Sequence, residues 1–169
     1  MTHTRIYPVT ARHNDAGHLE IGGCDVVELC DRHGTPLFIY DEVTLRQQCR
    51  AYAAAFSNLL ADCEIVYASK AFACRAMCEL VAEEGLSLDV ASGGELTIAK
   101  MAGFPPERIY YHGNNKTPPE IELGLQMGIG CFVVDSLEEI ETLEGMLARR
   151  HGGQRQRVLL RLTPGVRPD

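Results

Sequence analysis

The sequence lacks an excess of basic residues. Its 169 residues contain 16 Lys and Arg against 23 Asp and Glu, which gives a formal net charge of −7. Proteins that bind nucleic acids usually concentrate positive charge on one face. The one basic cluster surrounds Gly152-Gly153 and is interpreted as a solvated loop; it comprises Arg149, Arg150, Arg155 and Arg157. The charge balance therefore argues against a nucleic-acid partner.

Long apolar runs are also missing. No stretch approaches the roughly 18 consecutive apolar residues that cross a bilayer, and residues 1–20 lack the apolar centre of a secretory signal. We therefore expect no association with a membrane and a cytoplasmic location.

The cysteines and histidines show no pairing pattern. Seven cysteines are an odd number with irregular spacing, and they include no Cys-x-x-Cys pair. Cys74 and Cys78 lie four residues apart, but no histidine lies near them in sequence to complete a zinc site. The six histidines form no His-x-x-x-His pair. We expect reduced thiols and no metal site.

Nucleotide-binding glycine motifs are absent as well. The chain has neither Gly-x-Gly-x-x-Gly nor a Gly-Lys-Ser/Thr ending, so a dinucleotide site or a nucleotide phosphate loop has little support. The turn Ser92-Gly93-Gly94 has backbone amides that suit a phosphate, although this turn alone is a weak signal.

What the sequence does contain is a regular alternation of short apolar runs with longer amphipathic stretches. With 46% apolar residues, the chain is long enough for one globular core. The alternation is typical of β-α-β units around a parallel sheet. The runs predicted as strands are residues 37–40, 65–68, 88–91, 109–112, 131–134 and 158–162.

Helices are predicted between these strands. Apolar residues at spacings of three and four follow Asp41, which is a plausible cap; they are Leu45, Cys49, Tyr52, Phe56 and Leu60. Ser92 and Ser136 each stand three residues before a glutamate and directly after an apolar run, which is the spacing of a capping box. Each serine therefore marks a turn from strand to helix.

Lys70 ends the predicted strand 65–68 and is the most informative single residue. A lysine that is held in a buried, partly apolar setting loses its charge more easily and becomes a usable amine for Schiff-base chemistry. The alternative is an ordinary lysine that extends its ammonium group to solvent from a strand end. On local pattern alone both interpretations stay open.

Other polar residues fall at or near strand ends, where the loops of a parallel barrel gather functional groups on one face. Asp89 lies within the third predicted strand, His112 follows the fourth, and Arg161 lies on the sixth. Asp89 and Arg161 are expected to pair with each other or with a ligand, because a buried charge needs a partner. Asp135 follows the fifth strand, and its place beside a helix N-terminus explains it without catalysis.

Four segments resemble a known family. They are residues 67–72 (YASKAF), 86–96 (LSLDVASGGEL), 112–116 (HGNNK) and 160–166 (LRLTPGV). Together they are similar to the amino-terminal half of diaminopimelate decarboxylases, pyridoxal-phosphate enzymes with an alanine-racemase-like barrel. The similarity runs from about Gly34 to the last residue. Ornithine and arginine decarboxylases of the same class share the lysine strand and the aspartate and stay as alternatives.

The resemblance implies particular roles. Lys70 would bind pyridoxal 5'-phosphate as a Schiff base, and Ala68, Asp89 and Arg161 would line the cofactor pocket. His112 and Asn114 match a family segment at the barrel mouth. The implied reaction is decarboxylation of meso-diaminopimelate to L-lysine, with a small amino acid as substrate and a homodimer as the complete protein. A fragment that only binds the cofactor is the non-catalytic alternative.

The resemblance also implies an incomplete barrel. A (β/α)8 barrel needs roughly 250 residues, so the expected fold is α/β, a partial TIM-like barrel of the alanine-racemase type that stops after about five barrel strands. Residues 34–169 are expected to form the first portion of this cofactor-binding barrel. Residues 1–33 are expected to join the β-domain of the complete protein. The 169-residue chain by itself is expected to be inactive.

Overall fold

The computed structural model describes residues 6–60, 62–150, 155–162 and 164–165. The chain forms two compact units, residues 1–63 and residues 64–169, and each is described by itself. Part of the 160–166 segment that carries the resemblance lies outside the described residues.

The first unit combines a small antiparallel sheet with two helices. Strands β1 (Arg12–His13), β2 (Leu19–Ile21) and β3 (Cys24–Asp25) pair in sequence order, and this sheet was missed because strands of two or three residues leave no readable alternation. Helix α1 (Val26–His33) begins at Asp25, whose carboxylate accepts hydrogen bonds from the backbone N–H groups of Val27 and Glu28.

Helix α2 (Glu42–Ser57) confirms the helix predicted from the apolar stripe after Asp41. Asp41 is its N-cap and is buried. Burial raises the pKa of the Asp41 carboxyl, but hydrogen bonds from Thr44 and Thr10 outweigh it and hold that pKa below its usual range. The preceding residues 37–40 form no strand, contrary to prediction. A strand needs a neighbour to pair with, and no ladder includes this segment in the described part of the chain.

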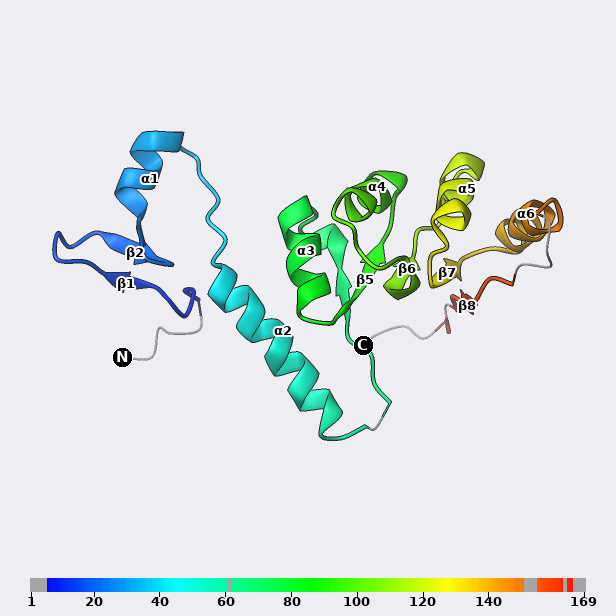
Figure 1. Ribbon diagram of the computed structural model, residues 1–169, viewed down its shortest axis with the longest axis horizontal. Helices are drawn as coiled ribbons and strands as arrows, with labels where there is room; N and C mark the ends of the chain where they lie inside the picture. Colours follow the sequence, from blue (N-terminus) through cyan, green and yellow to red (C-terminus); the bar gives the residue numbers. More distant parts are fainter. Residues whose placement is uncertain (1–5, 61, 151–154, 163, 166–169) are drawn as a thin grey trace. The chain divides into compact units, whose positions relative to one another are not determined.

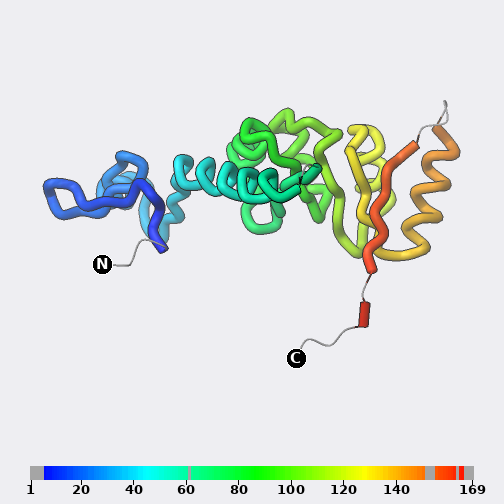
Figure 2. The backbone as a smooth tube through the Cα atoms, turned by 90° about the horizontal axis from the view of Figure 1, so that it is seen from below, coloured from blue at the N-terminus to red at the C-terminus, as the bar shows by residue number. Residues whose placement is uncertain are grey.

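The second unit is built on a parallel sheet of five strands in sequence order (Figure 1). They are β4 (Val66–Ala68), β5 (Ser87–Val90), β6 (Ile109–Tyr111), β7 (Cys131–Val134) and β8 (Val158–Leu160). All five were predicted to within two residues at either end. In Figure 2 the chain of this second unit runs from green to red. Sequential parallel order with a helix after each of the first four strands confirms the expected partial barrel of five strands.

Four helices connect the strands and lie along one face of the sheet (Figure 1). They are α3 (Arg75–Glu83), α4 (Gly93–Met101), α5 (Pro118–Met127) and α6 (Leu137–Ala148). Alternate strand residues supply the core beneath them; Leu88, Val90, Ile109, Tyr111, Phe132 and Val134 are each at most 2% exposed. This apolar layer leaves the other strand residues to the opposite face, which carries the polar groups.

The helix starts agree with the sequence signals. Ser92 and Ser136 are N-caps that accept hydrogen bonds from the backbone N–H groups of Glu95 and Glu139, as predicted. Helix α5 begins with Pro118-Pro119, where a missing N–H is harmless. It ends at Gly128, which adopts the left-handed conformation (φ 68°) that favours glycine.

Candidate functional site

Three predicted site residues meet at the carboxyl ends of neighbouring strands. The backbone register pairs Ala68 of β4 with Asp89 of β5, and His112 directly follows β6. Asp89 Oδ1 lies 3.6 Å from His112 Nε2. Lys70 lies two residues beyond Ala68, in the turn after β4, and its positive charge acts to lower the pKa of the Asp89 carboxyl. We call the set Lys70, Asp89 and His112 the rim cluster.

Asp89 has an unusual electrostatic environment. Its side chain is 21% exposed, and burial raises the pKa of its carboxyl above the ordinary value although His112 and Lys70 act in the opposite direction. Oδ1 is buried and accepts no hydrogen bond from any described residue. Such an oxygen costs free energy unless a ligand supplies the missing donor.

Lys70 differs from its predicted setting. It lies in a short 3-10 turn (Ser69–Ala71) after β4 and is exposed, whereas the sequence predicts a buried amine. The reason is the position of its strand, because β4 pairs only with β5 among the described residues and so has a covering neighbour on one side. The neighbouring Ser69 is buried.

Arg161 also differs from one prediction. It does not pair with Asp89, because its guanidinium Nε lies 3.3 Å from Asp135 Oδ1 at the end of the neighbouring strand. The two strands β5 and β8 are separated by β6 and β7 in the sheet, so a direct pair would have to span two strands. Asp135 thus holds Arg161 in addition to its place at the start of α6.

The two remaining predicted residues are less constrained. Ala68 is half-buried at the end of β4, and Asn114 is exposed in the loop between β6 and α5.

The Ser92-Gly93-Gly94 turn does not support the hypothesis that its backbone amides bind a phosphate. The Gly93 N–H already donates to Glu120 Oε1 at 2.8 Å, so a carboxylate holds that amide.

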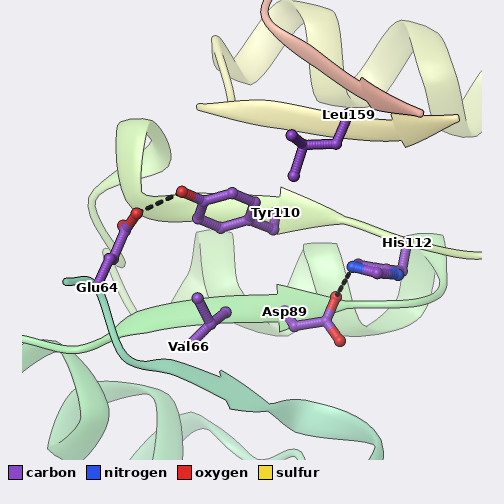
Figure 3. Close-up of a pocket in the computed structure, with 6 residues that line it drawn as sticks. All are labelled: Glu64, Val66, Asp89, Tyr110, His112 and Leu159. Carbon is purple, nitrogen blue, oxygen red and sulfur yellow. Dashed lines mark hydrogen bonds and ion pairs between the residues drawn. The ribbon is translucent and has the colours of Figure 1, made fainter. Parts of the chain in front are cut away.

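A cavity of about 420 Å³ lies on the sheet face opposite the helices and shares Asp89 and His112, but not Lys70, with the rim cluster. It is lined by Glu64, Val66, Asp89, Tyr110, His112 and Leu159. Figure 3 shows Asp89 and His112 turned toward each other at one end and Glu64 and Tyr110 joined at the other. The cavity therefore connects a rim that carries titratable groups to a polar floor.

The floor was missed by the sequence reasoning. Glu64 accepts hydrogen bonds from Ser87 Oγ and Tyr110 OH, and the Arg157 guanidinium donates to Tyr110 OH at 3.1 Å. The period of two was the available signal, because Glu64 precedes Val66 and Tyr110 precedes His112 on the same strand face. Of the basic cluster, Arg157 contacts this floor and Arg150 forms a 2.7 Å ion pair with Glu122. Residues 151–154 lie outside the described residues, so the solvated-loop interpretation stays a prediction.

Metal ligands and membrane segments were searched in the same residues. In the described part of the chain, no group of three or more His, Cys, Asp or Glu side chains is placed to hold a metal ion. None of the helices there combines the length and the apolar character of a bilayer crossing. All seven cysteines are free thiols.

The sequential parallel sheet and the rim cluster together define a class of protein. It is a β/α-barrel protein whose site lies at the carboxyl ends of the strands. The family comparison is more specific, since residues 43–168 match the model described as "Pyridoxal-dependent decarboxylase, pyridoxal binding domain". The chain belongs to this family of pyridoxal-dependent decarboxylases.

Individual relatives agree with the family. The chain is 49% identical over 157 residues to a diaminopimelate decarboxylase of Halalkalibacterium halodurans, and this covers 93% of the chain and 35% of the relative. The identity and coverage are the same for the diaminopimelate decarboxylase of Bacillus subtilis. The chain thus spans about a third of the length of these relatives.

Solved structures show the same likeness. A crystal structure of diaminopimelate decarboxylase from M. jannaschii superposes with a TM-score of 0.81 at 34% identity, covering 94% of this chain and 37% of the other. A lysine/ornithine decarboxylase from Vibrio vulnificus, complexed with putrescine, gives a TM-score of 0.67 at 27% identity, covering 81% and 35%.

The family implies pyridoxal phosphate, and the rim cluster fits it. Lys70 presents an amine that solvent and ligands can reach. Asp89 Oδ1 is a buried acceptor that receives no hydrogen bond from the described residues, so it can accept one from a ligand. An accessible amine next to a buried acceptor is a donor set that suits an aldehyde cofactor with polar ring substituents.

Proposed function

We propose that the complete protein is a pyridoxal-phosphate-dependent amino-acid decarboxylase that converts meso-diaminopimelate to L-lysine. The observation that carries the proposal is the rim cluster, in which the accessible Lys70 follows the end of β4 and the unsatisfied Asp89 carboxylate lies on the paired strand β5. The family match and the identity to diaminopimelate decarboxylases support the reaction. The proposal concerns the complete protein, because this chain spans only about a third of the length of its diaminopimelate decarboxylase relatives.

The chain's own residues divide the work. Lys70 would hold the cofactor through its side-chain amine and give it up to the substrate amine. Asp89 would orient the cofactor by accepting a hydrogen bond at Oδ1, and His112 keeps that carboxylate at the rim through its 3.6 Å contact. Ala68, Asn114 and Arg161 are proposed to line the same pocket. When bound, pyridoxal phosphate supplies the sink for the electron pair that carbon dioxide leaves behind.

The choice of substrate follows from the relatives. Identity to the diaminopimelate enzymes reaches 49%, while the structurally similar lysine/ornithine decarboxylase is 27% identical. One M. jannaschii diaminopimelate decarboxylase structure is a co-complex with L-lysine. These comparisons favour diaminopimelate over ornithine or arginine. A cytoplasmic homodimer is part of the proposal and stays a prediction.

The first prediction concerns covalent binding at Lys70. The full-length protein from the gene is incubated with pyridoxal phosphate, reduced with borohydride and digested, and the labelled peptide is identified by mass spectrometry. We expect the label on Lys70, and we expect Lys70→Ala to lose both the label and the release of carbon dioxide from meso-diaminopimelate. Lys100→Ala, an exposed lysine on α4, is the matched control and keeps both.

The same assay decides between the alternatives. Equal labelling of many lysines would contradict a formed site. Labelling at Lys70 with release of carbon dioxide from ornithine or arginine, and none from meso-diaminopimelate, would retain the class and overturn the substrate. Labelling without any decarboxylation would leave a cofactor-binding protein.

A further inference from the structure

The side chain of Lys116 is buried, and the proposed chemistry does not use it. Its side chain is 1% exposed, although lysines usually reach solvent. It lies in the loop between β6 and α5, the loop that carries His112 and Asn114. A buried ammonium is costly unless it is paired and hydrogen-bonded, so its surroundings must compensate it.

Two hydrogen bonds and one ion pair compensate the Lys116 ammonium. Nζ donates to the backbone carbonyl oxygens of Gly113 at 2.5 Å and Val133 at 2.9 Å. It also forms an ion pair of 2.8 Å with Glu139 Oε1, and the Glu139 side chain is 8% exposed. The ammonium further lies 5.7 Å from the ring centroid of Tyr111. Lys116 therefore joins its own loop to the end of β7 and to the first turn of α6.

The backbone of the loop 112–116 is also constrained at its first residues. Gly113 has φ 112°, and a Cβ there would meet the Ala91 carbonyl oxygen at 2.9 Å. On the N-terminal side of Gly113, the His112 N–H donates to the Val90 carbonyl at 2.7 Å. The loop is thus fixed at its start by the β5 backbone and at its end by the Lys116 ammonium.

Glu139 extends the connection to the next strand. Its second oxygen, Oε2, accepts a hydrogen bond from the Asp135 N–H at 3.2 Å. Asp135 in turn holds Arg161 at the end of β8. The Lys116–Glu139 pair consequently lies between two proposed pocket residues, His112 on one side and Arg161 on the other.

We propose that Lys116 is a positioning residue: its buried ion pair with Glu139 fixes the loop 112–116 and so sets His112 and Asn114 at the cofactor rim. This inference rests on the proposed function for its cofactor part. The ordering of the loop does not depend on any cofactor. The Lys116 ammonium is engaged by Gly113, Val133 and Glu139, so its effect on the rim passes through the loop.

The test uses the full-length protein and four variants. Lys116→Met removes the ammonium and keeps a similar length. In Lys116→Met, the Glu139 carboxylate stays buried without its partner, and this can prevent folding. The double variant Lys116→Met/Glu139→Gln removes that charge as well, so a folded protein without the ion pair can be measured. Leu143→Ala, a core truncation on α6, controls for lost stability. Lys100→Met controls for removal of a lysine at an exposed site.

The melting temperature of each variant is measured first, and two further measurements are made at a temperature where every variant is folded. Hydrogen exchange followed by mass spectrometry reports on the loop 112–117, and a fluorescence titration gives the Kd for pyridoxal phosphate. In both Lys116 variants we expect faster exchange in the loop and a Kd raised roughly 10- to 100-fold, the scale of an ångström-level misplacement in a site. Leu143→Ala and Lys100→Met are expected to keep the wild-type Kd and loop exchange.

The double variant separates positioning from stability. If the pair were only structural, removing both charges would restore the melting temperature and the Kd together. Positioning predicts that the melting temperature recovers while the Kd does not, because the two carbonyl contacts of Nζ are still missing. Unchanged loop exchange, or faster exchange with a normal Kd, would overturn the inference. If the wild-type protein binds no pyridoxal phosphate, the proposed function and the cofactor part of this inference fall, and the exchange data decide the loop ordering alone.

Discussion

At the scale of single residues, the proposed site residue Asp89 lowers the free energy of unfolding at neutral pH. Its carboxyl is held in a partly buried position where burial outweighs the attraction of His112 and Lys70. A group whose folded pKa is raised contributes its stability fully below the unfolded pKa and loses it as the pH rises through the folded pKa. At neutral pH the charged form of Asp89 is therefore a cost to folding.

We accordingly expect Asp89→Asn to raise the melting temperature of the 169-residue chain at pH 7, by roughly 2–4 °C for each kcal/mol gained. The gain should disappear at a pH below the unfolded pKa, where the wild-type carboxyl is neutral in both states. Circular dichroism melts at several pH values measure it. The control is Asp62→Asn at an exposed site; a gain that is independent of pH would contradict the assignment.

Glu64, at the floor of the cavity, has a pKa that is shifted in the opposite direction to that of Asp89. Burial raises the pKa of its carboxyl, but hydrogen bonds from Ser87 and Tyr110 and the charge of Arg157 outweigh it and lower that pKa. A lowered folded pKa contributes stability above the unfolded pKa, and this is lost as the pH falls through the folded value.

Glu64→Gln should therefore destabilise the chain at pH 7 by about 1 kcal/mol, the usual worth of hydrogen bonds at a partly exposed site. The difference from wild type should shrink as the solution becomes acidic. Urea unfolding at pH 7 and at acidic pH tests this, with the exposed Glu107→Gln as control. An equal loss at both pH values would mean that the carboxylate charge is not responsible.

At the scale of the elements, one glycine fixes how closely β7 approaches the turn before β6. A Cβ added at Gly130 would lie 2.0 Å from the Glu107 carbonyl oxygen, a backbone atom that cannot move aside alone. Gly130 N–H also donates to the Pro106 carbonyl at 2.8 Å. The entry into β7 therefore requires a residue without a side chain.

Gly130→Ala should destabilise the second unit by at least 2 kcal/mol, since overpacking a close backbone contact forces the strand to shift. Gly145→Ala on α6 is the matched control, because a Cβ there meets open space. That change should stabilise the helix by about 0.5–1 kcal/mol. Chemical denaturation of both variants measures the contrast, and similar effects from the two substitutions would contradict it.

At the scale of the whole molecule, the sheet has two exposed edges. Strands β4 and β8 each pair on one side only within the described residues. Apolar side chains are exposed along and beyond β8; they are Val158, Leu159, Leu160 and Leu162. An unpaired strand with apolar side chains is a template for pairing with another chain.

We therefore expect the 169-residue chain by itself to self-associate. Sedimentation velocity should show species larger than a monomer that grow with concentration. Lysine at an edge opposes such pairing, so Leu160→Lys/Leu162→Lys should reduce the association. Lys100→Ala on α4, away from the edge, should not. A sample that stays monomeric at every concentration would contradict this prediction.

The sequence by itself determined the strands and helix starts of the second unit and the long helix α2 of the first. The five strands, the caps at Ser92 and Ser136 and the helix after Asp41 follow from local periodicity and capping chemistry, which act over a few residues. The four family-like segments identified the class and placed Asp89 on one strand and His112 directly after the next. Residues 1–33, assigned to a second domain, stay a prediction.

Only the tertiary structure decided how side chains from different strands meet. In the structure, Lys70 is exposed at the end of an edge strand. Arg161 pairs with Asp135 and not with Asp89. The Lys116 side chain is buried against Glu139. Each outcome depends on which strands are neighbours and on what covers their ends. Burial and charge pairing are set by such long-range contacts, and a local sequence pattern carries no information about them.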